Sequence, residues 1–177
     1  MLDRRTFLVA IIGLLILLVV LERTGLSNLG DGDEPTDGDG QTEAEVVRVV
    51  DGDTIIVRLD GDEERLRYIG IDAPESSIPD QAPECFGPEA ARANEELVGG
   101  ETVLLEADVS NRDQFGRLLR YVYVDDGDDR FMVNQELVES GYAEAVRYPP
   151  DTAYADDLER AEEIARANRA GIWSACR

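Results

Sequence analysis

The sequence predicts an α+β fold that is mainly β: a small closed barrel of five short strands with about three helices around it. Short runs rich in β-branched residues recur after residue 44, and Asp-Gly turns separate several of them. One longer helical segment interrupts these runs, and further helical patterns follow at the C-terminal end. No internal repeat is visible, so we expect a single domain over residues 45–177.

Five strands are expected in order along this domain. The first two are runs of β-branched residues joined by the turn Asp51–Asp53, and a second Asp-Gly-Asp turn at residues 60–62 precedes the third. The last two flank a loop over residues 111–116. The predicted strands span residues 45–50, 54–59, 65–69, 102–107 and 118–124.

Three helices are expected as well. Pro88 suits the first turn of a helix over residues 89–98, and Asn134 is placed to cap a short helix that ends near residue 140. The last helix covers about residues 154–168. Five strands interrupted by one helix, with helices at the end, indicate a barrel of the OB-fold type. The core-facing positions of the last helix are predicted to be Leu158, Ala161, Ile164 and Ala165.

Residues 1–26 are expected to be an export signal or a membrane anchor. Arg4 and Arg5 stand before Phe7 and a 15-residue apolar run, which resembles a twin-arginine signal peptide. The run is shorter than the roughly 20 residues of a membrane-spanning helix, yet no Ala-x-Ala cleavage site follows it. Cleaved and membrane-anchored forms therefore both remain open. In either form the remainder of the chain is expected to be exported, either extracellular or on the outer face of the membrane.

Residues 27–44 are predicted to be a flexible acidic linker, because they contain many Gly, Asp and Glu and almost no apolar residues. The acidity is not confined to the linker. The chain has a net charge of −22, and beyond residue 43 there are still 31 acidic residues against 14 arginines. All 17 basic residues are arginine. This composition is expected of a halophilic protein kept soluble in molar salt, where the Debye length is about 3 Å.

The absence of histidine restricts the chemistry that the chain can perform. Acid–base catalysis must come from carboxylates, water, a metal or arginine. Two arginines and several carboxylates in turns would suit a phosphodiester. Arg67 and Arg117 could hold the phosphate, Asp53 and Asp72 a hard cation, and Glu75 a water molecule.

The two cysteines, Cys85 and Cys176, are a poor basis for a zinc site without histidine. Both lie in the part of the chain that we expect to be exported, where a cysteine pair is usually bonded. We therefore predict a disulfide between them. It would attach the C-terminal tail to the loop that precedes the first helix.

Six stretches of the sequence, taken together and in order, resemble the staphylococcal nuclease (thermonuclease) family, here in a halophile-type exported form. They span about residues 45–175, so the resemblance covers almost the whole predicted domain. The matching stretches are Val49–Thr54, Arg67–Glu75, Phe86–Ala90, Asp113–Arg117, Met132–Val138 and Gly171–Ser174.

The resemblance implies an OB-fold enzyme that uses Ca²⁺ to hydrolyse single-stranded DNA and RNA to 3′-phosphate products. Asp53, Asp72 and the carbonyl of Ala73 match the positions of the calcium ligands, and Asp51 matches an acidic residue that supports the metal loop. The catalytic positions are matched by Arg67, Glu75 and Arg117.

The sequence departs from the family pattern next to the second arginine. Gln114 and Phe115 stand where a lysine and a tyrosine are typical, which removes one positive charge and one hydroxyl group. Phe115 could still stack on a base. Tyr148 matches a tyrosine that contacts the nucleotide, so we expect both aromatic residues to bind substrate.

Two alternatives to an enzyme were weighed. One is a non-catalytic module of the same fold that binds nucleic acid or protein, and the other is an envelope protein whose acidic surface only solvates it. Retention of Arg67, Glu75 and Arg117 favours a calcium-dependent nuclease. We expect it to act as a monomer.

Overall fold

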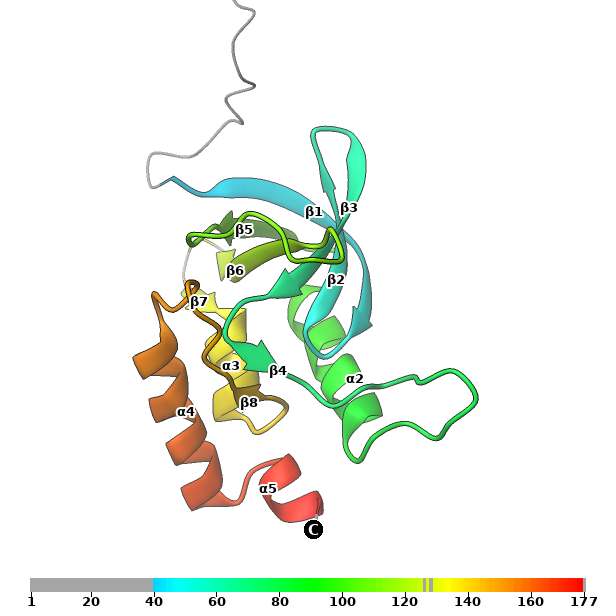
Figure 1. The fold of residues 1–177 in the computed structure, drawn as a ribbon, viewed down its shortest axis with the longest axis vertical. Coiled ribbons are helices and arrows are strands. Elements are labelled where there is room, and N and C mark those ends of the chain that lie inside the picture. Colours follow the sequence, from blue (N-terminus) through cyan, green and yellow to red (C-terminus); the bar gives the residue numbers. More distant parts are fainter. Residues whose placement is uncertain (1–39, 126, 128, 177) are drawn as a thin grey trace, which may run out of the picture. The chain divides into compact units, whose positions relative to one another are not determined.

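The computed structural model describes residues 40–125, 127 and 129–176, and Figure 1 shows how their helices and strands are arranged. The predicted export signal and most of the predicted linker lie outside the described residues. The described residues belong to one compact unit. None of the helices in this part of the chain is long and apolar enough to cross a membrane.

Five strands form the closed barrel that the sequence predicted. Neighbouring strands are antiparallel in the order β3-β2-β1-β5-β6, and a parallel pairing of β3 with β6 closes the ring. A short strand β7 extends the sheet beyond β6. The strands are β1 (Thr42–Asp51), β2 (Thr54–Leu59), β3 (Asp62–Tyr68), β5 (Thr102–Glu106), β6 (Leu118–Asp125) and β7 (Arg130–Met132).

The interior of the barrel is filled by alternate residues of these strands, as expected for sheets with one buried face. Ile55, Leu66, Leu105 and Val122 are fully buried, and so is the large ring of Tyr68. The buried Tyr68 hydroxyl donates a hydrogen bond of 2.9 Å to the side chain of Asn94. Burial raises the pKa of Tyr68, so this hydroxyl remains a neutral donor.

Helices cover the barrel (Figure 1). The Pro88 prediction is confirmed, since proline lies in the first turn of α2. In α4, Leu158, Ala161 and Ala165 are buried as predicted, but Ile164 is 40% exposed and does not belong to the core. The helices are α2 (Gly87–Val98), α3 (Val133–Glu139), α4 (Ala155–Asn168) and α5 (Ile172–Ala175).

The domain begins earlier than predicted. Strand β1 starts at Thr42, whereas we had assigned residues up to 44 to the linker. Ala44 is buried in the core, and the first four residues of β1 pair with β5. Polar Glu43 and Glu45 alternate with buried Thr42 and Ala44 at the start of the strand, so no run of consecutive apolar residues marks it in the sequence.

A small second sheet was not predicted at all. It pairs β4 (Ile71–Asp72) with β8 (Glu144–Ala145), and the N–H of Val146 donates to the carbonyl of Gly70 beside it. Each strand has only two residues, so no periodicity can reveal it. The sheet fixes the turn that follows β3, which carries several of the predicted site residues.

Asn134 does not cap α3, contrary to our prediction. The helix begins at Val133, and Asn134 is completely buried within its first turn. Its side-chain oxygen accepts from the N–H of Val122, and its side-chain nitrogen donates to the carbonyl of Ile69, both at 2.9 Å. The amide thus joins α3 to strand β6 and to the turn that follows β3.

Replacing Asn134 by alanine is expected to lower the free energy of unfolding by about 2–4 kcal/mol, because two buried backbone groups would lose their partners. Urea unfolding in molar salt measures this change. Glu139→Ala is the matched control, since Glu139 is exposed at the other end of the same helix. Equal stability of the two variants would contradict the role that we assign to Asn134.

Candidate active site

The turn between β1 and β2 supplies two buried carboxylates. Asp51 is the last residue of β1, and Asp53 is only 5% exposed. The N–H of Asp53 donates to Asp51 Oδ1 at 3.2 Å, and the Thr54 hydroxyl donates to Asp53 Oδ1 at 3.1 Å. The carbonyl of Asp51 accepts from the side chain of Asn94 in α2 at 2.9 Å. Both acids are therefore held in place by short-range bonds within the turn and by one bond to the helix.

Gly52 allows this turn to lie directly on its neighbours. A Cβ atom at Gly52 would stand 2.6 Å from the Cβ of Ala73 and 2.8 Å from the Cβ of Ala90. Both distances are too short for carbon atoms, so a side chain here would push the turn away from α2 and from the turn after β3. Packing therefore requires glycine at this position of the turn.

Arg67, near the end of β3, lies beside Asp53 and beside Asp72 of β4. The Arg67 guanidinium forms ion pairs with Asp53 and with Asp72, the latter at 2.6 Å between Nη2 and Oδ1. The N–H of Ala73 donates to Asp53 Oδ2 at 2.7 Å. The Asp72 side chain is 58% exposed, whereas those of Asp53 and Arg67 are nearly buried. The structure thus brings together Asp53, Arg67, Asp72 and Ala73 as the sequence predicted.

Glu75 lies just beyond this turn, and its backbone is closely held. Its N–H donates to the carboxylate of Glu84 at 2.9 Å, and its carbonyl accepts from the N–H of Glu84 at 3.0 Å. The start of α2 packs against the same peptide, because a Cβ atom at Gly87 would stand 2.2 Å from the Glu75 carbonyl oxygen. The charges of Asp51, Arg67, Asp72 and Glu84 all influence the pKa of the Glu75 carboxylate.

Arg117 is positioned by a turn in the loop before β6. Asp113 accepts three hydrogen bonds there: one from Arg117 Nε at 2.6 Å, one from the Arg117 N–H at 3.0 Å and one from the Phe115 N–H at 2.9 Å. The guanidinium carbon lies 5.6 Å from the centre of the Phe115 ring. One carboxylate therefore fixes both the backbone turn and the direction of the arginine.

The charges of the site influence one another. Burial lowers the pKa of Arg67, and the positive charge of Arg117 lowers it further, while Asp72 opposes both effects. Burial also raises the pKa of Asp51 in spite of Arg67. Partial burial and the charge of Asp51 raise the pKa of Glu75. Two guanidiniums that repel each other beside an acidic cluster are suited to bind an anion and a cation side by side.

A groove of about 410 Å³ runs past both arginines. Phe115 and Tyr148, the two predicted substrate-binding aromatics, line it with 75% and 57% of their surface exposed. Exposed aromatic rings beside a charged site are unusual in a small soluble domain, where large apolar side chains are mostly buried. They are suited to stacking on flat, partly apolar groups such as nucleobases.

Three residues that support the site were not assigned a role from the sequence: Glu84, Asn94 and Asp113. Asn94 lies in the middle of α2, where an asparagine is unfavourable unless its side chain has buried partners. Asp113 precedes Phe115 and Arg117 at spacings of two and four residues, which is a local signal for a turn of this kind. Glu84 has no local signal, because its partner is nine residues away.

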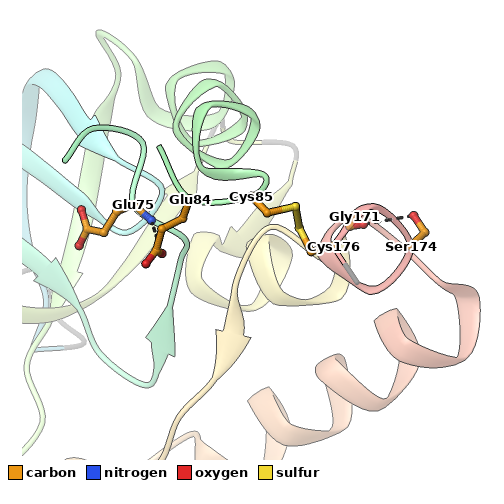
Figure 2. The surroundings of a disulfide bond; sticks show 6 residues. All are labelled: Glu75, Glu84, Cys85, Gly171, Ser174 and Cys176. Atoms are coloured by element: carbon orange, nitrogen blue, oxygen red, sulfur yellow. Dashed lines mark hydrogen bonds between the residues drawn. A yellow bond between two sulfur atoms is a disulfide. The ribbon is translucent and has the colours of Figure 1, made fainter. Parts of the chain in front are cut away.

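The structure joins Cys85 and Cys176 in a disulfide, which Figure 2 shows beside the Glu75 and Glu84 pair. The cysteines are 91 residues apart in the sequence, and their Cα atoms are 5.8 Å apart. The bond attaches the end of α5 to the residue immediately before Phe86 and α2. Phe86 itself stacks on Tyr142, with ring centres 5.6 Å apart.

The structure leads to a pH-dependent prediction for Asp113. Burial alone would raise its pKa, but the hydrogen bonds from Arg117 and Phe115 outweigh burial and lower it. Asp113→Asn is therefore expected to reduce the free energy of unfolding by about 1 kcal/mol at neutral pH. Because a lowered carboxyl pKa stabilises the fold above the unfolded-state value, this difference should shrink as the pH falls below about 4.

Urea unfolding at several pH values in molar salt measures the Asp113 effect. Asp80→Asn is the control, because Asp80 is exposed in the loop that precedes α2. A difference between wild type and Asp113→Asn that does not change with pH would contradict the assignment.

The acidic side chains fit a hard cation by their chemistry. They offer only oxygen donors, and four carboxylates adjoin two arginines. Within residues 40–125, 127 and 129–176, no three acidic or cysteine side chains form a ready metal site. The predicted ligand set is different, since it consists of Asp53, Asp72 and one backbone carbonyl. A cation bound there would share these carboxylates with Arg67 or displace it.

Comparisons with known proteins show the family to which the chain belongs. A family model described as staphylococcal nuclease homologue matches residues 65–175. The chain is 37% identical to a thermonuclease of Staphylococcus hyicus, over 73% of this chain and 74% of that protein. It is 38% identical to a thermonuclease of Staphylococcus intermedius, over 72% and 74%. It is also 40% identical to the SPbeta prophage-derived endonuclease YokF of Bacillus subtilis, over 72% of this chain and 42% of that protein. The chain therefore belongs to the staphylococcal nuclease family and is a nuclease.

Proposed function

We propose that this nuclease is an exported, calcium-dependent endonuclease that hydrolyses single-stranded DNA and RNA and leaves 3′-phosphates. The observation that carries the proposal is a groove lined by both Arg67 and Arg117 and by two exposed aromatic rings. Glu75 lies near enough for its pKa to respond to the charge of Arg67. Guanidiniums for the phosphate, a carboxylate for the water and rings for the bases are the groups that such a reaction needs.

The reaction that we propose divides the work among these three residues. Arg67 and Arg117 donate hydrogen bonds to the phosphoryl oxygens, and both remain charged at any working pH. Glu75 orients a water molecule and accepts its proton as the water attacks phosphorus. The bond from phosphorus to the 5′ oxygen breaks, so the phosphate stays on the 3′ oxygen. The leaving oxygen takes up a proton from solvent.

Ca²⁺ is the cofactor that we propose for this site. Asp53, Asp72 and the Ala73 carbonyl would hold it, and Asp51 would support the turn that presents Asp53. When bound, the ion would supply Lewis-acid stabilisation of the charge on the phosphate. The substrate is an anion, which carboxylates alone would repel. Binding of a cation accounts for the excess of carboxylates over arginines at this site.

Single-stranded substrates suit the groove better than duplexes. The rings of Phe115 and Tyr148 are exposed and can stack only on bases that are not already paired and stacked. The domain has a large negative charge, so we expect little long-range attraction to nucleic acid. In molar salt that attraction is screened for any protein, and contacts inside the groove decide binding.

The proposed setting follows from the sequence outside the described residues. A twin-arginine signal peptide would export the domain, which would then be extracellular or held at the outer face of the membrane if the signal is not cleaved. We propose that the domain is monomeric and halophilic.

Degradation of heat-denatured DNA in molar salt tests the proposal. We expect hydrolysis with Ca²⁺ and a loss of at least about 100-fold in rate with a calcium chelator, which corresponds to several kcal/mol of transition-state stabilisation. The hydrolysis rate of Glu75→Gln in the presence of Ca²⁺ serves as the background. Undiminished activity in chelator would overturn the metal assignment, and equal rates for wild type and Glu75→Gln would indicate a binding module instead.

A further inference from the structure

We propose that Glu84 is a positioning residue for Glu75, and that the Cys85–Cys176 disulfide fastens Glu84 in the place where it does so. The proposal deepens the function proposed above and rests on it, because Glu75 is the residue that would activate water. It assigns a role in that reaction to an acid and a disulfide that do not touch the substrate groove.

The contact between the two glutamates is reciprocal. The Glu84 carboxylate accepts from the N–H of Glu75, and the N–H of Glu84 donates to the carbonyl of Glu75. Both backbone polar groups of Glu75 are thereby bound to one residue. The pair therefore fixes the backbone from which the Glu75 side chain extends, and with it the set of positions that the carboxylate can reach.

The loop closed by this pair has little else to hold it. Residues 76–83 run from the second sheet to α2 and extend away from the barrel, as Figure 1 shows. Most of these residues are exposed, and the one internal pairing joins Ile78 to Gln81. Without buried side chains of its own, the loop must be fixed at its ends. Glu75 and Glu84 are those ends.

The disulfide supplies the second attachment. Cys85 follows Glu84 directly, and its partner Cys176 follows α5 (Figure 2). Helix α5 is itself anchored, because the N–H of Ile172 donates to the carbonyl of Gly141 at 2.9 Å. Gly171 and Gly141 are packed so closely that a Cβ at Gly171 would stand 2.0 Å from the Gly141 oxygen. A covalent path thus connects the firmly packed C-terminal end to the residue that holds Glu75.

The first test compares two substitutions of Glu84. Glu84→Ala removes the acceptor for the Glu75 N–H, so kcat should fall by about 10- to 100-fold, the loss expected from a misplaced catalytic group. KM should change little, because the arginines and the groove are intact. Glu84→Gln keeps an acceptor oxygen and should restore most of kcat. Glu89→Ala, an exposed acid in the first turn of α2, is the control and should behave as wild type.

The second test removes the disulfide. The double variant Cys85→Ala/Cys176→Ala should also have a lower kcat than wild type, but the loss should be smaller than in Glu84→Ala. When Glu84→Ala is added to the two cysteine substitutions, kcat of this triple variant should be no lower than that of Glu84→Ala alone, because both changes act through one contact. Amide hydrogen exchange gives a readout besides activity: the Glu75 N–H should exchange faster in Glu84→Ala and in the cysteine variant, and not in Glu89→Ala.

Three results would overturn the proposal: unchanged kcat and exchange in Glu84→Ala, failure of Glu84→Gln to restore kcat, or losses that multiply in the triple variant. If the cysteine variant does not fold, the comparison of Glu84→Ala with Glu84→Gln still decides the role of Glu84. Inactivity of the wild-type protein with Ca²⁺ would instead refute the proposed function, and the exchange measurement would then report on the Glu75–Glu84 contact by itself.

Discussion

Arg117→Ala is expected to lower kcat/KM by about 10³-fold, because a guanidinium that stabilises the charge developing on phosphate is worth roughly 4 kcal/mol in the transition state. The structure makes this expectation specific. Asp113 directs the Arg117 side chain at its Nε, which leaves the terminal nitrogens to donate to an anion. Arg67 is close enough that its pKa responds to the charge of Arg117. The measurement is steady-state hydrolysis of denatured DNA in molar salt.

Arg112→Ala is the matched control for this experiment. Arg112 belongs to the same loop, but its guanidinium is committed to Glu64 at 2.8 Å and to the carbonyl of Gly116 at 2.8 Å. We expect it to retain activity within a few-fold, since surface ion pairs contribute little. Arg117→Lys should recover only part of the loss, because lysine lacks the planar pair of donors. Similar activity of Arg117→Ala and Arg112→Ala would remove Arg117 from the catalytic group.

We expect the domain to unfold when salt is withdrawn. Beyond residue 43 the 31 acidic residues exceed the 14 arginines by 17, so most acids cannot be neutralised by a basic partner within the chain. At about 0.01 M salt the Debye length is about 30 Å, and these charges repel one another across the whole domain. At molar salt the repulsion is confined to near neighbours. The free energy of unfolding, measured with urea, should therefore rise steeply with KCl concentration.

Charge-neutralising variants give the control for the salt effect. Glu89 and Glu96 are exposed on α2, remote from the barrel interior. Changing both to glutamine removes two negative charges with little change in shape, so the domain should stay folded at a lower salt concentration than wild type. Full stability of the wild-type domain without added salt would refute the halophilic assignment.

The residues that we propose for catalysis can be predicted from the sequence because their signals are local. Asp51 and Asp53 are adjacent in one turn, Arg67 and Glu75 bracket another, and Gly116 precedes Arg117. The structure brings these separate turns together at one place because β3 pairs with both β2 and β6 and so aligns their ends. The order of the motifs along the chain predicted that the three turns would lie together, which no single motif could have predicted.

The errors have a common cause in long-range contacts. Asn134 was predicted to be a cap because asparagine favours helix ends, yet strand β6 and the turn after β3 offer its amide better partners. Ile164 follows the helical period of α4, but the neighbouring elements do not extend over it, and it remains exposed. The two-residue strands β4 and β8 exist only because they meet each other.

The sequence by itself determined the barrel class and the strongly acidic character of the domain, and it predicted the residues that we propose for the active site. These properties depend on patterning along short segments and on composition, which can be read without knowing what lies nearby. Only the tertiary structure decided how the site is supported: that Asn94 holds Asp51, that Asp113 directs Arg117, and that Glu84 holds Glu75. The physical reason is that a side chain gains an orientation from hydrogen bonds and packing with residues that folding brings to it.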